Sequence, residues 1–210
     1  DIYSVFSIGI YPKVLLEIGT DENTGESFNN SELSRIEKEI DYFKSFCDPE
    51  FYVVQTGSLV KEIGQVGRFN NYFVISASKL LKSKNIKFKE HNADYLPKKE
   101  IEKRSGLIDA LNIAPQLGAI QTQIVLNNCS IYGINPEDFM NESYNGRKWD
   151  KWLHKSTPQD KLLRSIIAGH YHFKSDNYKK LVNQLEEHID INNLISEKIT
   201  EVIKYYHDGI

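Results

Sequence analysis

The feature that most limits the fold of this chain is a set of four short apolar runs, each bounded by polar or turn-forming residues. They are too short for buried helices and have the length of buried strands. The four runs cover residues 14–19, 51–56, 86–90 and 111–114. Helical patterns separate them, and strands that alternate with helices predict βαβ units and a parallel sheet.

The residues between and after these runs follow the spacing of amphipathic helices. One such helix, from near Ser31 to before Asp48, places four apolar side chains on one face, namely those of Leu33, Ile36, Ile40 and Phe43. A second helix is predicted over residues 72–82, and a short third helix after Pro97.

The sequence pattern changes after Asn127. The chain beyond Pro136 has the spacing of helices and no convincing strand pattern. The last helix is predicted to run from about Ser196 to Gly209, with at least one other helix before it. We therefore expect βα units over residues 1–134 and a helical C-terminal extension over residues 135–210. Trp149 and Trp152 are expected to be packed side chains.

The number of strands decides between two architectures. A closed eight-stranded barrel usually needs roughly 250 residues, and this chain has 210 residues with four good strands. We predict an α/β fold of the (β/α)8 TIM-barrel type, present as a partial barrel of about four parallel strands followed by the helical tail. An open doubly wound sheet is the alternative. Because residue 1 is Asp and the chain begins as though within an element, upstream sequence is expected to be missing.

Charge and composition exclude several classes of protein. Lys plus Arg number 26 against 29 Asp plus Glu, so no basic field exists to gather nucleic acid or anionic lipid. Cys47 and Cys129 lie far apart and outside any CxxC pattern, which argues against a zinc knuckle or a disulfide framework. No apolar run approaches the length of a membrane span, and no signal peptide is visible. We expect a cytoplasmic protein that contacts neither nucleic acid nor membrane.

Polar side chains follow the predicted strands, where the active sites of parallel α/β proteins lie. Asp21 follows the first run, Gln55 ends the second, and His91 follows the third. We predict that these three side chains meet at one rim of the sheet.

The segment FKEHNADYL gathers carboxylates, an imidazole and a phenol directly after a strand. Such groups bind divalent metals or transfer protons, because neutral imidazole is a metal ligand and titrates near neutral pH. A hydrogen-bonded loop histidine is the alternative for His91, and an ordinary acidic turn is the alternative for Asp21 and Glu22.

Other polar groups receive structural interpretations. The glycines at 57, 64 and 67 miss the spacings of nucleotide phosphate loops and are interpreted as turn glycines. His170 and His172 are two residues apart, which places them on one side only in an extended segment. A helix is predicted there, so both are interpreted as structural.

Four segments, in order, resemble the accessory-subunit family of D-tagatose-1,6-bisphosphate aldolase, also called tagatose-6-phosphate kinase or epimerase-like. EIGTDE resembles a family strand that ends in IGTE, VVQTG resembles VVQPG, EHNADY resembles AHSTDY, and LNIAPQLG resembles LKVGPAL. The resemblance implies an aldolase-type barrel. A GGDH-like segment that the family has in its early strands is absent here.

Position by position, the resemblance retains some residues of the family pattern and changes others. The retained residues are Gln55, His91, Asp94 and Tyr95. Asp21 stands in place of a Glu, Asn112 in place of a Lys, and Thr56 in place of a Pro. The departures predict a changed substrate or activity.

The leading hypothesis is a metal-assisted sugar or sugar-phosphate enzyme of the aldolase (lyase) or epimerase type. Its catalytic residues would be Asp21, His91 and Asp94, with Asp21 and His91 as ligands of a divalent ion such as zinc. Asp94 would accept a hydrogen bond from the His91 ring. The substrate would be contacted by Gln55, Glu90, Asn112 and Arg164; a phosphate contact by Arg164, or by Lys161, is inferred from charge and position alone.

Two other functions remain open. The chain could be a non-catalytic subunit that stabilises a class II aldolase partner through its helical tail, or that forms a homo-oligomer. It could also be a sugar-binding module on a flavodoxin-like sheet, which would have strands in open order and no metal.

Overall fold

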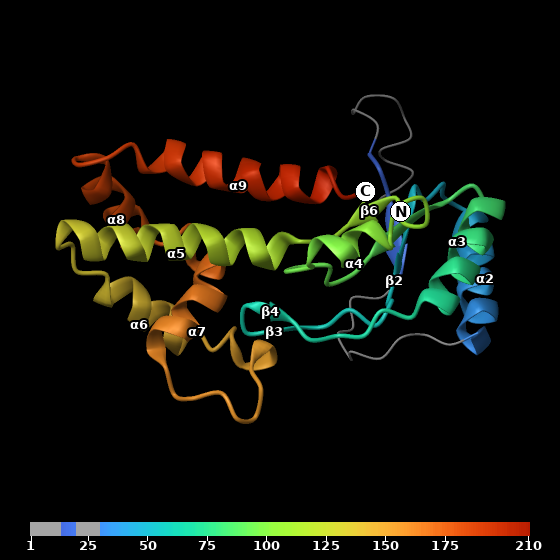
Figure 1. Cartoon of the computed structure of the whole chain (residues 1–210), viewed down its shortest axis with the longest axis horizontal. Helices are drawn as coiled ribbons and strands as arrows, with labels where there is room; N and C mark the ends of the chain where they lie inside the picture. The colour runs from blue at the N-terminus through green and yellow to red at the C-terminus, as the bar shows by residue number, and fades with distance from the viewer. Residues whose placement is uncertain (1–13, 20–29) are drawn as a thin grey trace. The chain divides into compact units, whose positions relative to one another are not determined.

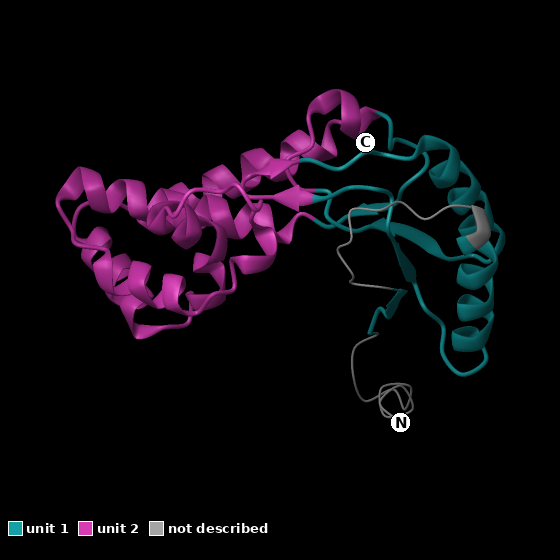
Figure 2. Cartoon of the chain, turned by 90° about the horizontal axis from the view of Figure 1, so that it is seen from below, with its two compact units in different colours: residues 1–59, 66–93, 103–112 teal, residues 60–65, 94–102, 113–210 magenta. Residues whose placement is uncertain are grey.

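The computed structural model describes residues 14–19 and 30–210, which form two compact units (Figure 2). Unit 1 comprises the described residues up to 59, with 66–93 and 103–112. Unit 2 comprises residues 60–65, 94–102 and 113–210. The predicted division into 1–134 and 135–210 follows the sequence rather than this packing, and it stays a prediction.

Among the described residues, unit 1 has a parallel sheet of four strands in the order β1-β2-β5-β6. Figure 1 labels β2 and β6 of this sheet. The strands are β1 (Glu17–Gly19), β2 (Phe51–Val54), β5 (Lys87–Glu90) and β6 (Ala110–Leu111). Their spatial order follows their order in the chain, and every adjacent pair is parallel. The predicted α/β fold with four parallel strands is confirmed; closure of a barrel stays a prediction.

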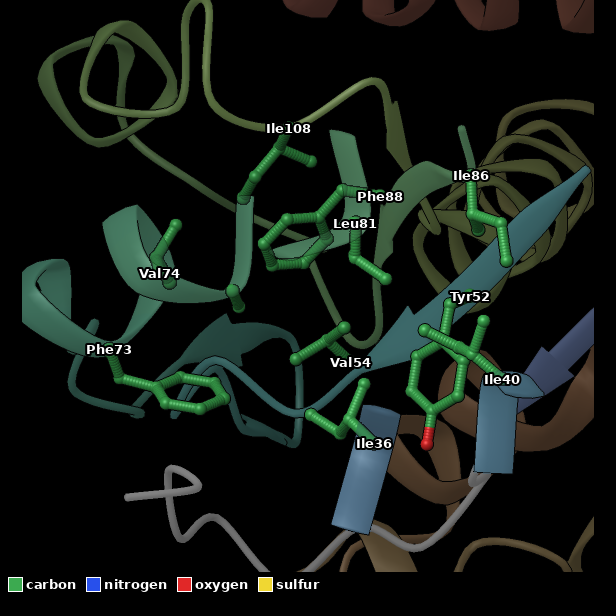
Figure 3. Close-up of a cluster of buried hydrophobic side chains, with 11 residues drawn as sticks. Ile36, Ile40, Tyr52, Val54, Phe73, Val74, Leu81, Ile86, Phe88 and Ile108 are labelled. Atoms are coloured by element: carbon green, nitrogen blue, oxygen red, sulfur yellow. The ribbon is translucent and has the colours of Figure 1, made fainter. Parts of the chain in front are cut away.

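One face of this sheet packs against helices α2 (Asn30–Lys44) and α3 (Asn71–Ser83). Alternation along the strands directs every second side chain to that face, and the helices present residues spaced three and four apart. Figure 3 shows the resulting cluster. Its buried members are Ile36, Ile40, Tyr52, Val54, Phe73, Val74, Ala77, Leu81, Ile86, Phe88 and Ile108.

Unit 2 is mainly helical. Its helices are α4 (Lys98–Glu102), α5 (Ala114–Tyr132), α6 (Glu137–Asn145), α7 (Lys161–Ala168), α8 (Asp176–Glu186) and α9 (Ile191–His207), with 3-10 turns η1 (Asp150–Trp152) and η2 (Gly169–His172). A two-stranded hairpin, β3 (Val60–Lys61) and β4 (Gly64–Gln65), belongs to the same unit. The predicted helical tail after Pro136 is confirmed.

Two apolar clusters hold unit 2 together. In the larger one, α5 packs with the helices that follow it, through buried residues such as Val125, Phe139 and Leu185. The smaller cluster joins the hairpin to η1 and α7. There Trp149 and Trp152 are 7% and 6% exposed, which confirms the expectation that they are packed.

The helix starts of unit 2 explain where the sequence-based bounds were inaccurate. The Asp190 side chain accepts a hydrogen bond from the backbone of Asn193, so α9 begins at Ile191 rather than near Ser196. Pro115 occupies the first turn of α5, where a missing N–H costs nothing. The fourth predicted strand therefore ends at Leu111, and α5 begins at Ala114. Among the described residues, no helix has the length and apolarity needed to cross a membrane.

Candidate functional site

The strand register of unit 1 places three polar residues next to one another. Val54, Glu90 and Leu111 end adjacent strands and are in register with one another. The residues that follow them are Gln55, His91 and Asn112. Gln55 and His91, two of the side chains predicted at strand ends, therefore lie with Asn112 along one edge of the sheet, as parallel strands require.

Gln55 and His91 are in direct contact. The Gln55 Nε2 lies 3.2 Å from the His91 Nδ1. Gln55 is 2% exposed, and its Oε1 is buried without a hydrogen-bond partner among the described residues. If the amide group donates, the proton of a neutral His91 ring is on Nε2; if the amide is turned, its oxygen accepts from Nδ1–H and Nε2 becomes an acceptor. The orientation of the Gln55 amide and the tautomer of His91 are therefore coupled through this contact.

A cavity of about 610 Å³ opens on this side of the sheet. Its volume falls in the range of small-molecule sites. It is lined by Glu17, Ile18, Gly19, Arg35, Glu39, Phe43, Val53, Lys89, His91 and Asn112. Most of the sheet residues in this set belong to the face opposite the α2–α3 core, because they alternate with the buried side chains.

Cations and carboxylates are paired around the cavity. Lys89 contacts Glu17 at 2.5 Å. Arg35 contacts Glu32 and Glu39, each at 2.7 Å, and the hydrogen bond to Glu32 is the main cause that raises the pKa of Arg35. These pairs are partly exposed and are therefore weak, so an anionic ligand could compete with the carboxylates for both cations.

Glu90 points to the other face of the sheet. It is fully buried, and its two oxygens are bound by Arg104, at 2.5 Å from Nε and 2.9 Å from Nη2. The hydroxyls of Thr56 and Ser58 also donate to Glu90. Because successive side chains along a strand point to opposite faces, Glu90 points to the same face as Phe88 and away from the cavity that His91 lines. Its predicted contact with substrate stays a prediction.

Asp94 belongs to unit 2 and is fully buried. Its Oδ1 accepts from the backbone N–H of Gln116 at 2.7 Å, and its Oδ2 has no partner among the described residues. Burial raises the pKa of this carboxyl to about 7. Gln116 continues the network, because its Oε1 accepts from Tyr206 Oη. The predicted role of Asp94 as acceptor for the His91 ring stays a prediction.

Arg164 is 2% exposed in unit 2. Its Nη1 donates to the carbonyls of Pro158 and Asp160, and its guanidinium lies over the Trp149 ring. Lys161 pairs with Glu137. The phosphate contact predicted for Arg164 or Lys161 is not tested by these contacts and stays a prediction.

The predicted metal site depends on Asp21, which lies outside the described residues. Within 14–19 and 30–210, no group of three or more His, Cys, Asp or Glu side chains is arranged to hold an ion. His91 could supply one ligand through Nε2, but Glu90 is already bound to Arg104. The described residues alone therefore do not fit a divalent metal, and the metal stays a prediction.

His170 and His172 lie in the 3-10 turn η2 and have separate surroundings. His170 is close to Gly118, and burial lowers the pKa of its ring. His172 lies 3.4 Å from Glu142. Their structural interpretation agrees with these contacts.

Sequence reasoning did not find Arg35, Lys89 or Arg104. Lys89 carried a signal, because alternation places it with His91 on one face of β5. Arg35 lines the cavity from α2, one helical turn before Glu39, and Arg104 reaches Glu90 from a turn 14 residues further along the chain. Neither of these arginines has a local sequence signature.

Comparison with solved structures shows where this fold has been seen before. One neighbour is described as a probable tagatose 6 phosphate kinase from Sinorhizobium meliloti 1021, with a TM-score of 0.73, 14% identity and 93% of this chain covered. Another is the fructuronate-tagaturonate epimerase UxaE from Cohnella laeviribosi, with a TM-score of 0.51, 11% identity and 99% of this chain covered. At these identities the likeness shows the fold alone.

The chain spans 62% of the length of the first neighbour and 46% of the second. No family model matches the sequence, and no curated protein matches it.

Proposed function

We propose that this chain is part of an aldolase-type (β/α) barrel that binds a sugar or sugar phosphate at the carboxyl ends of its parallel strands. The observation that carries the proposal is the contact between Gln55 and His91 at adjacent strand ends, where His91 also lines a cavity of small-molecule size. An amide and an imidazole can each donate to and accept from sugar hydroxyls.

Two further features support this proposal. The names of both structural neighbours refer to sugars or sugar acids. The strand order follows the chain order, and two helices cover one sheet face, while strand residues of the opposite face, together with three residues of α2, line the cavity. This is the arrangement of successive βα units in a barrel, whose active sites lie at the carboxyl ends of the strands.

In this proposal, Gln55 orients a hydroxyl of the sugar, and His91 exchanges a proton or a hydrogen bond with a neighbouring oxygen. Lys89 and Arg35 line the same cavity and attract a phosphate or carboxylate group of the ligand. Aldolase and epimerase chemistry both require proton movement beside a carbonyl, which a neutral imidazole can supply near neutral pH.

A second candidate is a non-catalytic subunit that retains sugar binding and supports an aldolase partner. The observation that favours it is the state of Glu90, the carboxylate next to His91 in the chain. Arg104, Thr56 and Ser58 occupy its oxygens, so it is unsuited to accept a proton from His91.

Calorimetric titration with tagatose 6-phosphate, tagatose and inorganic phosphate tests the proposal. We expect saturable binding of at least one of the two sugars, weakened about fivefold or more in Gln55→Ala and in His91→Ala, because each loses a hydrogen bond worth about 1 kcal/mol or more. Gln123→Ala and the exposed His207→Ala are matched controls that should bind normally. Absence of binding by the unmodified protein, or equal binding by all variants, would refute the proposal.

Turnover separates the two candidates. The same protein, assayed with an added divalent metal for cleavage or epimerisation of the bound sugar, should show activity that is lost in His91→Ala. Binding without any turnover would favour the non-catalytic subunit.

A further inference from the structure

We infer that the buried pair Glu90–Arg104, with Thr56 and Ser58, positions the two side chains of the proposed sugar site. This inference deepens the proposed function and rests on it for the ligand. The pair lies on the opposite side of the sheet from the cavity, so Glu90 and Arg104 would act through Gln55 and His91 rather than touch the ligand.

The hydrogen-bond network around the Glu90 carboxylate is complete. Glu90 and Arg104 are 0% and 1% exposed, and they meet in a two-point contact. The Ser58 Oγ donates to Glu90 at 2.5 Å and accepts from Arg104 Nη2 at 3.1 Å. The guanidinium also lies 4.1 Å from the centroid of the Phe69 ring. Every polar atom of the carboxylate therefore has a partner.

Two members of this network are chain neighbours of the two side chains of the proposed site. Glu90 directly precedes His91, and Thr56 directly follows Gln55. The hydrogen bond from Thr56 to Glu90 therefore links the end of β2 to the end of β5 from one face, while Gln55 and His91 meet on the other. The backbone N–H of His91 also donates to Val54 O at 3.3 Å. Movement of either strand end would alter both contacts together.

The net stability of a buried ion pair does not explain why Glu90 and Arg104 are paired here. A buried ion pair contributes little net stability, because desolvation of both charges offsets their attraction, and a well-packed apolar pair is often as stable. The apolar cluster of this sheet face already supplies packing. A buried pair is better explained by the geometry that it imposes, here at the strand ends that carry the proposed site.

The test uses a variant that removes both charges together, because a lone buried charge could prevent folding. In Glu90→Gln/Arg104→Met, the amide oxygen still accepts from Thr56 and Ser58, and both charges of the pair are removed. Lys198→Met/Glu201→Gln, on an exposed pair in α9, is the matched control. The tautomer of His91 is read from its ring nitrogens by long-range ¹H–¹⁵N NMR, with His91→Ala for assignment.

We expect the unmodified protein and the control to show one His91 tautomer. The double variant should remain cooperatively folded, while the two ring-nitrogen shifts of His91 move toward a common average and sugar-phosphate affinity falls at least tenfold. Unchanged His91 shifts in the folded double variant would overturn the inference. If the double variant does not fold, Thr56→Val, which removes one link and keeps the shape of the side chain, must shift the same His91 signals; unchanged signals there would equally overturn it.

These readouts also separate the two proposals. The His91 shifts test positioning without any ligand. Failure of the unmodified protein to bind a sugar would refute the proposed function while leaving the tautomer result to decide whether Glu90 and Arg104 are positioning residues.

Discussion

The protonation of Asp94 couples the stability of unit 2 to pH. The unfolded chain releases this proton near the ordinary pKa of 3.8, whereas the folded chain retains it up to about 7. Between these values the folded state binds more protons, so the free energy of unfolding falls as the pH rises, and it levels off above 7. The loss is at most about 4 kcal/mol.

We therefore expect Asp94→Asn to lose this part of the pH dependence and to be more stable than the unmodified protein at pH 8. Asparagine keeps the oxygen that accepts from Gln116 and carries no charge. The measurement is urea unfolding at pH 5 and pH 8, followed by the fluorescence of Trp149 and Trp152, which lie in the same unit as Asp94. The fully exposed Asp176→Asn should leave the slope intact. An unchanged slope in Asp94→Asn would contradict the assignment.

For single residues, the sequence predicted that Gln55 and His91 lie close together, because residues that follow adjacent parallel strands must lie near each other. It grouped Glu90 with His91 through their proximity in the chain. Alternation along β5 separates them, and only the folded structure reveals Arg104 as the partner. Glu90 and Thr56 also stand where the quoted family stretches AHSTDY and VVQPG have Ala and Pro, so two departures from that pattern contact each other.

Among the elements, the segment between β2 and α3 depends on the close approach of two backbone stretches at Gly67. A Cβ at this position would lie 2.1 Å from Gly57 O and 2.3 Å from Leu59 N. Gly67→Ala should therefore lower the free energy of unfolding by about 1 to 3 kcal/mol through overpacking. Gly64→Ala is the control, because its nearest atom would be 3.9 Å away. Chemical denaturation monitored by circular dichroism should distinguish them, and equal midpoints would be inconsistent with this close approach.

The stability of helix α9 depends on its N-cap residue, Asp190. Asp190 Oδ1 accepts from the N–H of Asn193 at 2.9 Å, and removal of such a cap costs about 1 kcal/mol. Asp190→Ala should lower the unfolding midpoint of unit 2 accordingly. Asp208→Ala, at the other end of the helix, removes an exposed carboxylate from the negative end of the helix dipole and should not destabilise. A midpoint in Asp190→Ala equal to that of the unmodified protein would show that the cap contributes nothing.

The sequence predicted the elements with a regular apolar spacing well and the other elements poorly. The predicted helix 72–82 corresponds to α3, because its apolar spacing is regular. The β3–β4 hairpin was missed, since each strand has only two residues and no periodicity can be recognised. Helix α5 was also missed, because several of its buried positions are small or polar, such as Gly118 and Thr122, while apolar residues such as Ile131 are exposed, so its sequence shows no clear amphipathic stripe.

For the whole molecule, the two units have separate apolar cores. Leu81 is buried in the core of unit 1 and Leu185 in the core of unit 2. Each Leu→Ala substitution should cost about 2 to 5 kcal/mol. We expect Leu185→Ala to lower the midpoint detected by tryptophan fluorescence, because both tryptophans belong to unit 2. Leu81→Ala should lower the midpoint detected by circular dichroism alone. Equal shifts of both probes in both variants would show that the units unfold together.

The sequence could not reveal this division, because neither unit is continuous in the chain. The predicted boundary at residue 134 follows a change from strands to helices. Packing instead assigns α5 and the segment 60–65 to one unit. Which segments pack together is decided by contacts between distant residues, such as Glu62 N with Trp152 O at 2.6 Å.

The chain passes from one unit to the other at residues 59–60, 65–66, 93–94, 102–103 and 112–113. During synthesis on the ribosome, all described strands of the parallel sheet have emerged once β6 is complete. The hairpin at 60–65 contacts Trp152, and α4 packs with α9. Neither of these partners has been synthesised at that point. Translation must continue from Leu111 to Trp152 before the hairpin can pack, and to His207 before α9 is complete. Until then these two segments are open loops beside the described strands, where nascent-chain chaperones and proteases can reach them.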